Sequence, residues 1–188
     1  MKRNSKVLIF IIAIIFSQIF CLYAQDVDIK YNSDKGIFTM PFGKSYDYSN
    51  IIVQRVVDGD TLLLENGERV RLIGIDTPEL HPSEKLNRDS QRTQQDAGTI
   101  QKLGQQAYEF TKKLVEGKAV SLEFDLEKYD KYNRLLAYVY LKDGTFVNAD
   151  IVKQGYASLM TIAPNVKYAD LFSKLYQEAQ ENQRGLWK

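Results

Sequence analysis

The stretch VVDGDTLLLENGERVRLIGIDTPE, residues 56–79, carries the strongest fold signal in the chain. Two β-rich runs, 61–64 and 69–75, stand on either side of Asn66-Gly67, a dipeptide that favours a tight hairpin turn. A further β-rich run, 51–57, precedes them. The stretch therefore predicts three consecutive strands, with the second folded back directly onto the third.

The rest of the chain adds a helix, two strands and two more helices to these three strands. The pattern first predicts a polar loop over 80–102 and then a helix that ends at Gly117 and has one apolar face, formed by Leu103, Ala107, Phe110 and Leu114. Two β-rich runs follow, over 119–126 and 135–141. The chain then predicts a short helix capped by Asn148, a last helix after Pro164, and Trp187 packed back onto the core. Five strands with a helix between the third and fourth is the order of an OB-fold barrel. The pattern alone supports an α+β domain without deciding on a barrel.

The N-terminus has the layout of a secretory signal peptide. A basic start is followed by the apolar run 7–16 and by small residues ending at Ala24, which predicts a signal peptide over 1–24 and a secreted or periplasmic protein. An uncleaved anchor and a lipid on Cys21 are alternatives, and the bulky Phe20 before that cysteine argues against the lipid. Residues 25–50 are then an N-terminal extension.

Charge limits what the mature chain can bind. Cleavage after Ala24 removes three of the 25 basic side chains and leaves 22 against 24 acidic ones, a net charge of −2. A mature chain of this charge has no general attraction for nucleic acid, so any such binding needs a local basic cluster. It also has no cysteine, so its stability comes from packing rather than from disulfides.

Carboxylates gather at one end of the predicted strands. Asp58 and Asp60 face the same side of an extended chain, and the hairpin can bring Asp60 to Asp76, with Glu79 just beyond. Like charges repel, and a hard cation such as calcium is one reason to collect them. A single histidine, His81, gives too little for a zinc site. Taken singly, each aspartate also suits a turn or a strand end.

Two arginines make the carboxylate pattern harder to explain by turns alone. Arg71 lies five residues before Asp76, and Arg134 lies at the entry to the fifth predicted strand. A guanidinium beside a bound cation can hold a phosphate through two hydrogen bonds and a fixed charge.

Three motifs together resemble the staphylococcal (micrococcal) nuclease, or thermonuclease, family. They are DGDT at 58–61, RVRLIGIDTPE at 69–79 and DKYNR at 130–134, and the likeness runs from about Ile51 to the C-terminus. The resemblance implies an OB barrel with three helices over 51–188. It also implies a monomeric, calcium-dependent, sugar-nonspecific nuclease that prefers single-stranded DNA or RNA, leaves 3′-phosphate ends and has no stable membrane association.

The resemblance also assigns roles to individual residues. It implies that Asp60, Asp76 and the Thr77 carbonyl bind calcium, with Asp58 acting through water. It implies that Glu79 activates the attacking water and that Arg71 and Arg134 bind the phosphate. It also implies nucleic-acid contacts from Lys131, Tyr132 and Tyr156. The sequence departs from the family at Asn133, where glycine is usual, and at 158–165, where a pair of tyrosines is missing. Two rival hypotheses are a catalytically inactive nucleic-acid-binding module and a calcium-binding envelope protein; the second leaves both arginines unexplained.

Overall fold

The computed structural model describes residues 30–32, 37–39, 47–83, 86, 88, 90–91 and 96–188. The chain divides into two compact units, Met1–Tyr46 and Asp47–Lys188. In the first unit, strands β1 (Lys30–Asn32) and β2 (Ile37–Thr39) pair antiparallel. The predicted signal peptide lies outside the described residues. Within the described part of the chain, no helix combines the length and the apolar character needed to cross a membrane.

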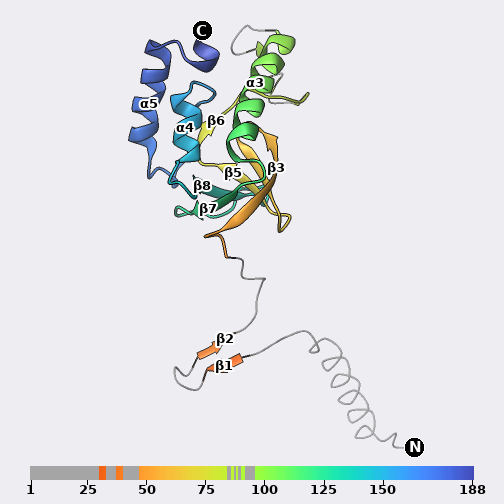
Figure 1. Cartoon of the computed structure of the whole chain (residues 1–188), viewed down its shortest axis with the longest axis vertical. Helices are drawn as coiled ribbons and strands as arrows, with labels where there is room; N and C mark the ends of the chain where they lie inside the picture. The colour runs from red at the N-terminus through yellow and green to blue at the C-terminus, as the bar shows by residue number, and fades with distance from the viewer. Residues whose placement is uncertain are drawn as a thin grey trace, which may run out of the picture. The chain divides into compact units, whose positions relative to one another are not determined.

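The second unit is built on a closed five-stranded barrel (Figure 1). Its strands are β3 (Ile51–Asp58), β4 (Thr61–Leu64), β5 (Arg69–Leu72), β7 (Ala119–Glu123) and β8 (Leu135–Leu141). They follow the order β3-β4-β5-β8-β7, and the barrel closes where β7 pairs with β3. The predicted hairpin joins β4 to β5 antiparallel, whereas β5 and β8 run parallel. Alternate apolar side chains of these strands fill the interior, as in other small barrels.

Among its described residues, this unit has the helices α3 (Ala97–Val115), α4 (Val147–Lys153) and α5 (Ala169–Glu181). Helix α3 stands between the third and fourth strands of the barrel, and α4 and α5 pack together on the C-terminal side (Figure 1). A 3₁₀ turn, η2 (Gly185–Trp187), ends the chain, and Trp187 meets Tyr176 edge-on at 5.3 Å between ring centroids. The predicted α+β fold, an OB barrel with three helices, is confirmed.

Helix α3 corrects the predicted loop over 80–102, because it begins at Ala97. Asp96 caps it, accepting a hydrogen bond of 3.0 Å from the backbone N–H of Thr99. The predicted face is only partly right: Ala107 is buried and Phe110 and Leu114 pack against the core, but the fully buried positions are Ile100, Gly104, Ala107, Thr111 and Val115. Small side chains on this face let the helix approach the loops beneath it, and apolar periodicity does not register glycine or threonine as buried positions.

The third predicted strand, 69–75, is broken into two in the structure. Strand β5 ends at Leu72, and β6 (Gly74–Asp76) leaves the barrel to pair with β9 (Ser158–Met160). Gly74 turns the chain with a φ of +82°, and the ring of Phe172 lies 2.5 Å from where its Cβ would be. The break places Asp76 opposite Ser158, at the end of a separate two-stranded sheet.

Asn148 is not the predicted helix cap. Helix α4 begins at Val147, and the side chain of Asn148 is fully buried inside it. Its Oδ1 accepts from the N–H of Val139 at 3.0 Å, and its Nδ2 donates to the carbonyl of Ile73 at 3.0 Å. The amide therefore satisfies two buried backbone groups, one of which, the Ile73 carbonyl, lies at the break between β5 and β6. Buried backbone groups need such hydrogen-bond partners.

Candidate active site

Two buried carboxylates share one arginine at the edge of the barrel. Asp60 precedes β4, Asp76 ends β6, and Arg71 projects from β5 between them. Nη1 of Arg71 lies 3.0 Å from Oδ2 of Asp60, and Nη2 lies 2.8 Å from Oδ1 of Asp76. Asp60 is 4% exposed and Asp76 8%, so a buried positive charge offsets the repulsion between them.

The strand break after Leu72 also fixes the direction of the Arg71 guanidinium. Nη1 donates to the carbonyl of Ile75 at 2.9 Å and, more weakly, to the carbonyl of Leu72 at 3.3 Å. Nη2 also lies 3.8 Å from the sulfur of Met160 on β9. Five donors in a rigid plane can meet two carboxylates and two carbonyls at once, which a lysine ammonium cannot do.

Asp60 ties the start of β4 to the exit of β6. Its Oδ1 accepts from the hydroxyl of Thr61 at 3.0 Å, and its Oδ2 accepts from the N–H and hydroxyl of Thr77 at 3.0 and 3.1 Å. Gly59 permits this close approach, because a Cβ there would lie 2.7 Å from Oγ1 of Thr77. The structure therefore brings together Asp60, Arg71, Asp76 and Thr77, which the motifs predict as one site.

The donors at this site suit a hard cation. Asp60, Asp76 and the Thr77 carbonyl offer only oxygen atoms, the donor type that calcium and magnesium prefer. The carboxylate pair also contacts a positive group, Arg71, which offsets one of its two negative charges. Among the described residues no group of three or more His, Cys, Asp or Glu side chains could hold a metal ion, so the protein itself supplies few carboxylates. Water or substrate oxygens would have to complete the coordination shell.

Asp58 and Glu79 flank the pair and contact the local chain. Oδ1 of Asp58 accepts from the N–H of Gly59 at 2.8 Å, in a turn. Oε2 of Glu79 accepts from the hydroxyl of Ser83 at 3.2 Å. The calcium-shell role of Asp58 and the base role of Glu79 stay predictions.

Helix α3 supports the loops that carry these residues, a role that its apolar pattern does not indicate. The buried hydroxyl of Thr111 donates to the carbonyl of Gly59 at 2.7 Å. Gly104 faces the chain after β6, where a Cβ would lie 2.5 Å from the carbonyl oxygen of Glu79. The available signal was the glycine itself, since a glycine inside a helical pattern often marks a close backbone approach.

Replacing Gly104 with alanine is therefore expected to destabilise the protein and displace Glu79. Alanine gains about 1 kcal/mol of helix propensity over glycine. The added methyl group meets backbone rather than a flexible side chain, and overpacking of this kind costs about 1–3 kcal/mol. We expect the clash to outweigh the gain, measured as a lower midpoint of urea unfolding together with a lower kcat on nucleic acid.

Gly98→Ala is the matched control for Gly104→Ala. Gly98 is exposed in the first turn of the same helix, and its added Cβ would meet only a side-chain oxygen of Asp96, at 3.1 Å. Its unfolding midpoint and kcat should stay close to those of the wild type. Equal stability of both variants would contradict the close packing of α3 on Glu79.

Arg134 is aimed by the loop that precedes β8. Oδ2 of Asp130 accepts from Nε of Arg134 at 2.7 Å, and Oδ1 accepts from the backbone N–H groups of Arg134 and Tyr132, each at 2.9 Å. Asn133, where the family usually has glycine, takes up the left-handed conformation with a φ of 60°. Asparagine tolerates this conformation better than most residues, so the turn keeps its shape.

A cavity of about 450 Å³, here called the arginine cavity, joins the two arginines. Arg71 and Arg134 both line it, together with Lys131, Tyr132 and the apolar side chains of Met160 and Ile162. Tyr132 is 69% exposed. The structure does not bring Tyr156 to this group, because its ring stacks on Phe110 of α3 at 4.5 Å.

Asp130 makes the aim of Arg134 depend on pH. Burial alone would raise the pKa of Asp130, but hydrogen bonds from Arg134 and Tyr132 outweigh it and hold the pKa below the usual 3.8. A depressed carboxyl pKa contributes stability that is present above pH 3.8 and is lost as pH falls below it.

Asp130→Asn should therefore unfold more easily than wild type at pH 6, with the difference shrinking below pH 3.8. Asp170→Asn, at an exposed position on α5, is the control. A difference that is constant with pH would contradict the ion pair.

Comparison with known proteins decides the family. The family model described as "Staphylococcal nuclease homologue" matches residues 69–188. The chain belongs to the staphylococcal nuclease family. It is 40% identical to a thermonuclease of Staphylococcus intermedius over 149 residues, which cover 78% of this chain and 77% of that protein. It is 36% identical to the endonuclease YncB of Bacillus subtilis over 143 residues, 73% of this chain and 61% of that protein. The resemblance predicted from the three motifs is confirmed.

Proposed function

We propose that this nuclease family member is a secreted, calcium-dependent enzyme that hydrolyses phosphodiester bonds of single-stranded DNA and RNA and leaves 3′-phosphate ends. The observation that carries the proposal is the placement of Arg71. Its guanidinium touches both buried carboxylates and also lines a cavity shared with Arg134. Family membership and relatives named thermonuclease and endonuclease support a hydrolytic nuclease.

The residues of this chain supply most of what phosphodiester hydrolysis needs. Arg71 and Arg134 approach the arginine cavity from β5 and β8, so a phosphate there can accept hydrogen bonds from both. Two fixed positive charges oppose the negative charge that grows on the phosphate oxygens as water attacks. Glu79 can orient that water and take its proton, with its backbone held by α3.

Asp60, Asp76 and Thr77 would hold the calcium ion. When bound, such an ion adds Lewis-acid stabilisation of phosphate charge and orients the substrate. Asp60 is kept in place by two threonines, and Asp76 is kept by its pairing with Ser158, whose hydroxyl donates to the Asp76 carbonyl at 3.1 Å. These bonds hold both carboxylates in position before any ligand arrives.

The rival proposal of an inactive nucleic-acid-binding module is weaker. It expects loss of some of the charged residues on which catalysis depends. Asp60, Arg71, Asp76, Glu79 and Arg134 are all present. Selection for binding alone would not require two acids buried against an arginine, because buried charges are costly to maintain.

Digestion of single-stranded DNA tests the proposal. The full chain is expressed with its own N-terminus, purified, and incubated with substrate in calcium or in excess EGTA, followed by end-group analysis. We expect cleavage in calcium alone and products with 3′-phosphate ends. N-terminal sequencing should show a mature chain that begins at Gln25. Absence of cleavage by a folded protein would support the binding module, and cleavage that persists in EGTA would contradict the calcium dependence.

A further inference from the structure

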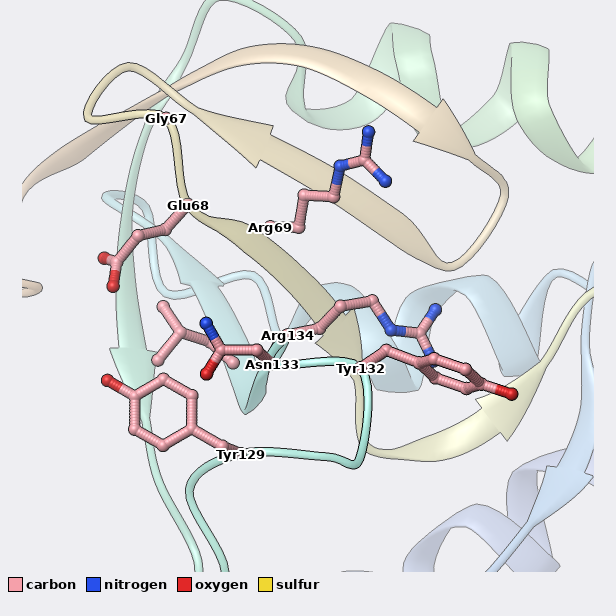
Figure 2. A pocket seen from close by; sticks show the side chains of 8 residues that line it. Gly67, Glu68, Arg69, Tyr129, Tyr132, Asn133 and Arg134 are labelled. Atoms are coloured by element: carbon pink, nitrogen blue, oxygen red, sulfur yellow. The ribbon is translucent and has the colours of Figure 1, made fainter.

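A second cavity, of about 650 Å³, is also lined by Arg134 (Figure 2). We call it the hairpin cavity, because it lies between the turn of the β4–β5 hairpin and the loop before β8. It is lined by Gly67, Glu68, Arg69, Tyr129, Tyr132, Asn133, Arg134 and Leu135. Of these residues, the proposed function gives a phosphate-binding role only to Arg134.

We propose that the hairpin cavity is a subsite for a nucleotide adjoining the scissile phosphate, with Arg69 binding its phosphate and Tyr129 stacking on its base. The inference rests on the proposed function for the identity of the substrate. It adds a second binding position and two residues, Arg69 and Tyr129, that extend the path of a single strand beyond the arginine cavity.

Charge favours a phosphate at Arg69. This side chain is exposed, and in the described part of the chain it forms no ion pair. Arg69 and Arg71 are two residues apart on β5, so they face the same side and are separated by about 6.6 Å of strand rise. That separation is similar to the spacing of neighbouring phosphates along an extended single strand. Figure 2 shows Arg69 and Arg134 extending in the same direction from the two walls.

Two exposed aromatic rings on one loop favour bases as the other partner. Tyr129 is 41% exposed and Tyr132 is 69% exposed, and both line the hairpin cavity. The backbone of Tyr129 pairs with Leu135, and the ammonium of Lys128 lies 5.6 Å from its ring centroid, so the ring is held in place. Every base has a stacking face, so such rings bind single strands with little sequence preference.

The two cavities share two lining residues. Tyr132 and Arg134 line both, so a strand that places its scissile phosphate at Arg71 and Arg134 can pass over Arg134 to Arg69. Glu68 is the acid of the hairpin cavity. Its Oε2 accepts from the hydroxyl of Tyr48 at 2.6 Å and from Nδ2 of Asn66 at 2.7 Å. Glu68 also lies toward the end of the cavity opposite the two guanidinium groups (Figure 2). Its negative charge therefore does not repel a phosphate bound at those groups.

The test compares a long and a short substrate. Cleavage of an octathymidylate and of a nitrophenyl ester of a single thymidine nucleotide is measured for wild type, Arg69→Gln, Tyr129→Ala and Tyr129→Phe. The ratio of kcat/KM, long over short, should fall by about tenfold for Tyr129→Ala and for Arg69→Gln, since stacking and phosphate contacts are each worth that much. Tyr129→Phe keeps the ring and should keep the ratio.

Lys174→Gln is the charge-matched control, because Lys174 is exposed on α5. Its ratio should equal that of the wild type. The subsite is overturned if Arg69→Gln and Tyr129→Ala retain the wild-type ratio, or if Lys174→Gln lowers it equally. A wild-type protein that cleaves neither substrate would instead reject the proposed function.

A binding measurement tests the subsite without cleavage. A fluorescent octathymidylate is titrated in calcium-free buffer at several salt concentrations. Loss of one phosphate contact in Arg69→Gln should reduce the slope of log affinity against log salt by about 0.7, whereas Tyr129→Ala should weaken binding with the slope retained. An unchanged slope for Arg69→Gln, or no binding by the wild type, would contradict the subsite.

Discussion

Replacing Arg71 with lysine is expected to lower kcat/KM for single-stranded DNA by on the order of 10³-fold, the range seen when one preorganised donor to transition-state charge is removed. In this protein the Arg71 guanidinium has two roles at the same time. It pairs with both Asp60 and Asp76, and it lines the arginine cavity. A lysine ammonium retains the charge but cannot meet both carboxylates and the carbonyl of Ile75 in one plane.

The fold should survive this substitution, so the loss can be assigned to the site. Lost hydrogen bonds at a buried position cost about 1–3 kcal/mol, which is small against a total stability of about 5–15 kcal/mol. The unfolding midpoint is measured alongside kcat and KM. Arg184→Lys is the control, because Arg184 pairs with Glu178 near the C-terminus. Near wild-type kcat/KM for Arg71→Lys would remove Arg71 from the mechanism.

Replacing Glu79 with glutamine is expected to lower kcat by roughly 10²–10⁴-fold, with a small effect on KM. The amide keeps the size of the side chain and can still meet the hydroxyl of Ser83, but it cannot take a proton from water. A loss confined to kcat is the signature of an interaction made in the transition state rather than in substrate binding.

Single-turnover cleavage of single-stranded DNA at saturating calcium checks the role of Glu79. Glu109→Gln is the matched control, since Glu109 is exposed on α3. The variant Glu79→Gln should bind a nucleotide bisphosphate with wild-type affinity. A rate within twofold of wild type would show that another group activates the water, and weakened binding with an unchanged rate would make Glu79 a substrate contact.

Arg71 and Glu79 are positioned by different parts of the fold. Arg71 is locked by carboxylates and carbonyls of the strands. Glu79 belongs to the chain after β6, whose position depends on α3 through Gly104. Gly104→Ala should therefore resemble a mild Glu79 variant in kcat and leave the phosphate-binding residues in place.

The amino-acid sequence alone predicts the hairpin, the positions of most strands and the family. Asn66-Gly67 favours a tight turn, and turn chemistry is local, so two residues are enough to predict it. The hairpin accounts for the approach of Asp60 to Arg71, because pairing β4 with β5 places Thr61 opposite Arg71. The position of Asp76 depends in addition on β6, which leaves the barrel to pair with β9.

The remaining features depend on contacts between segments that are distant in the sequence, which local patterns do not reveal. The third strand breaks at Gly74 because the ring of Phe172 occupies the space of a side chain there, and β6 finds its partner in β9, over 80 residues later. Helix α3 buries Gly104 and Thr111 because they face the Glu79 and Gly59 backbones. Periodicity records which side chains are apolar. It carries no information on which backbone will lie against them, and here that backbone carries the carboxylates of the site.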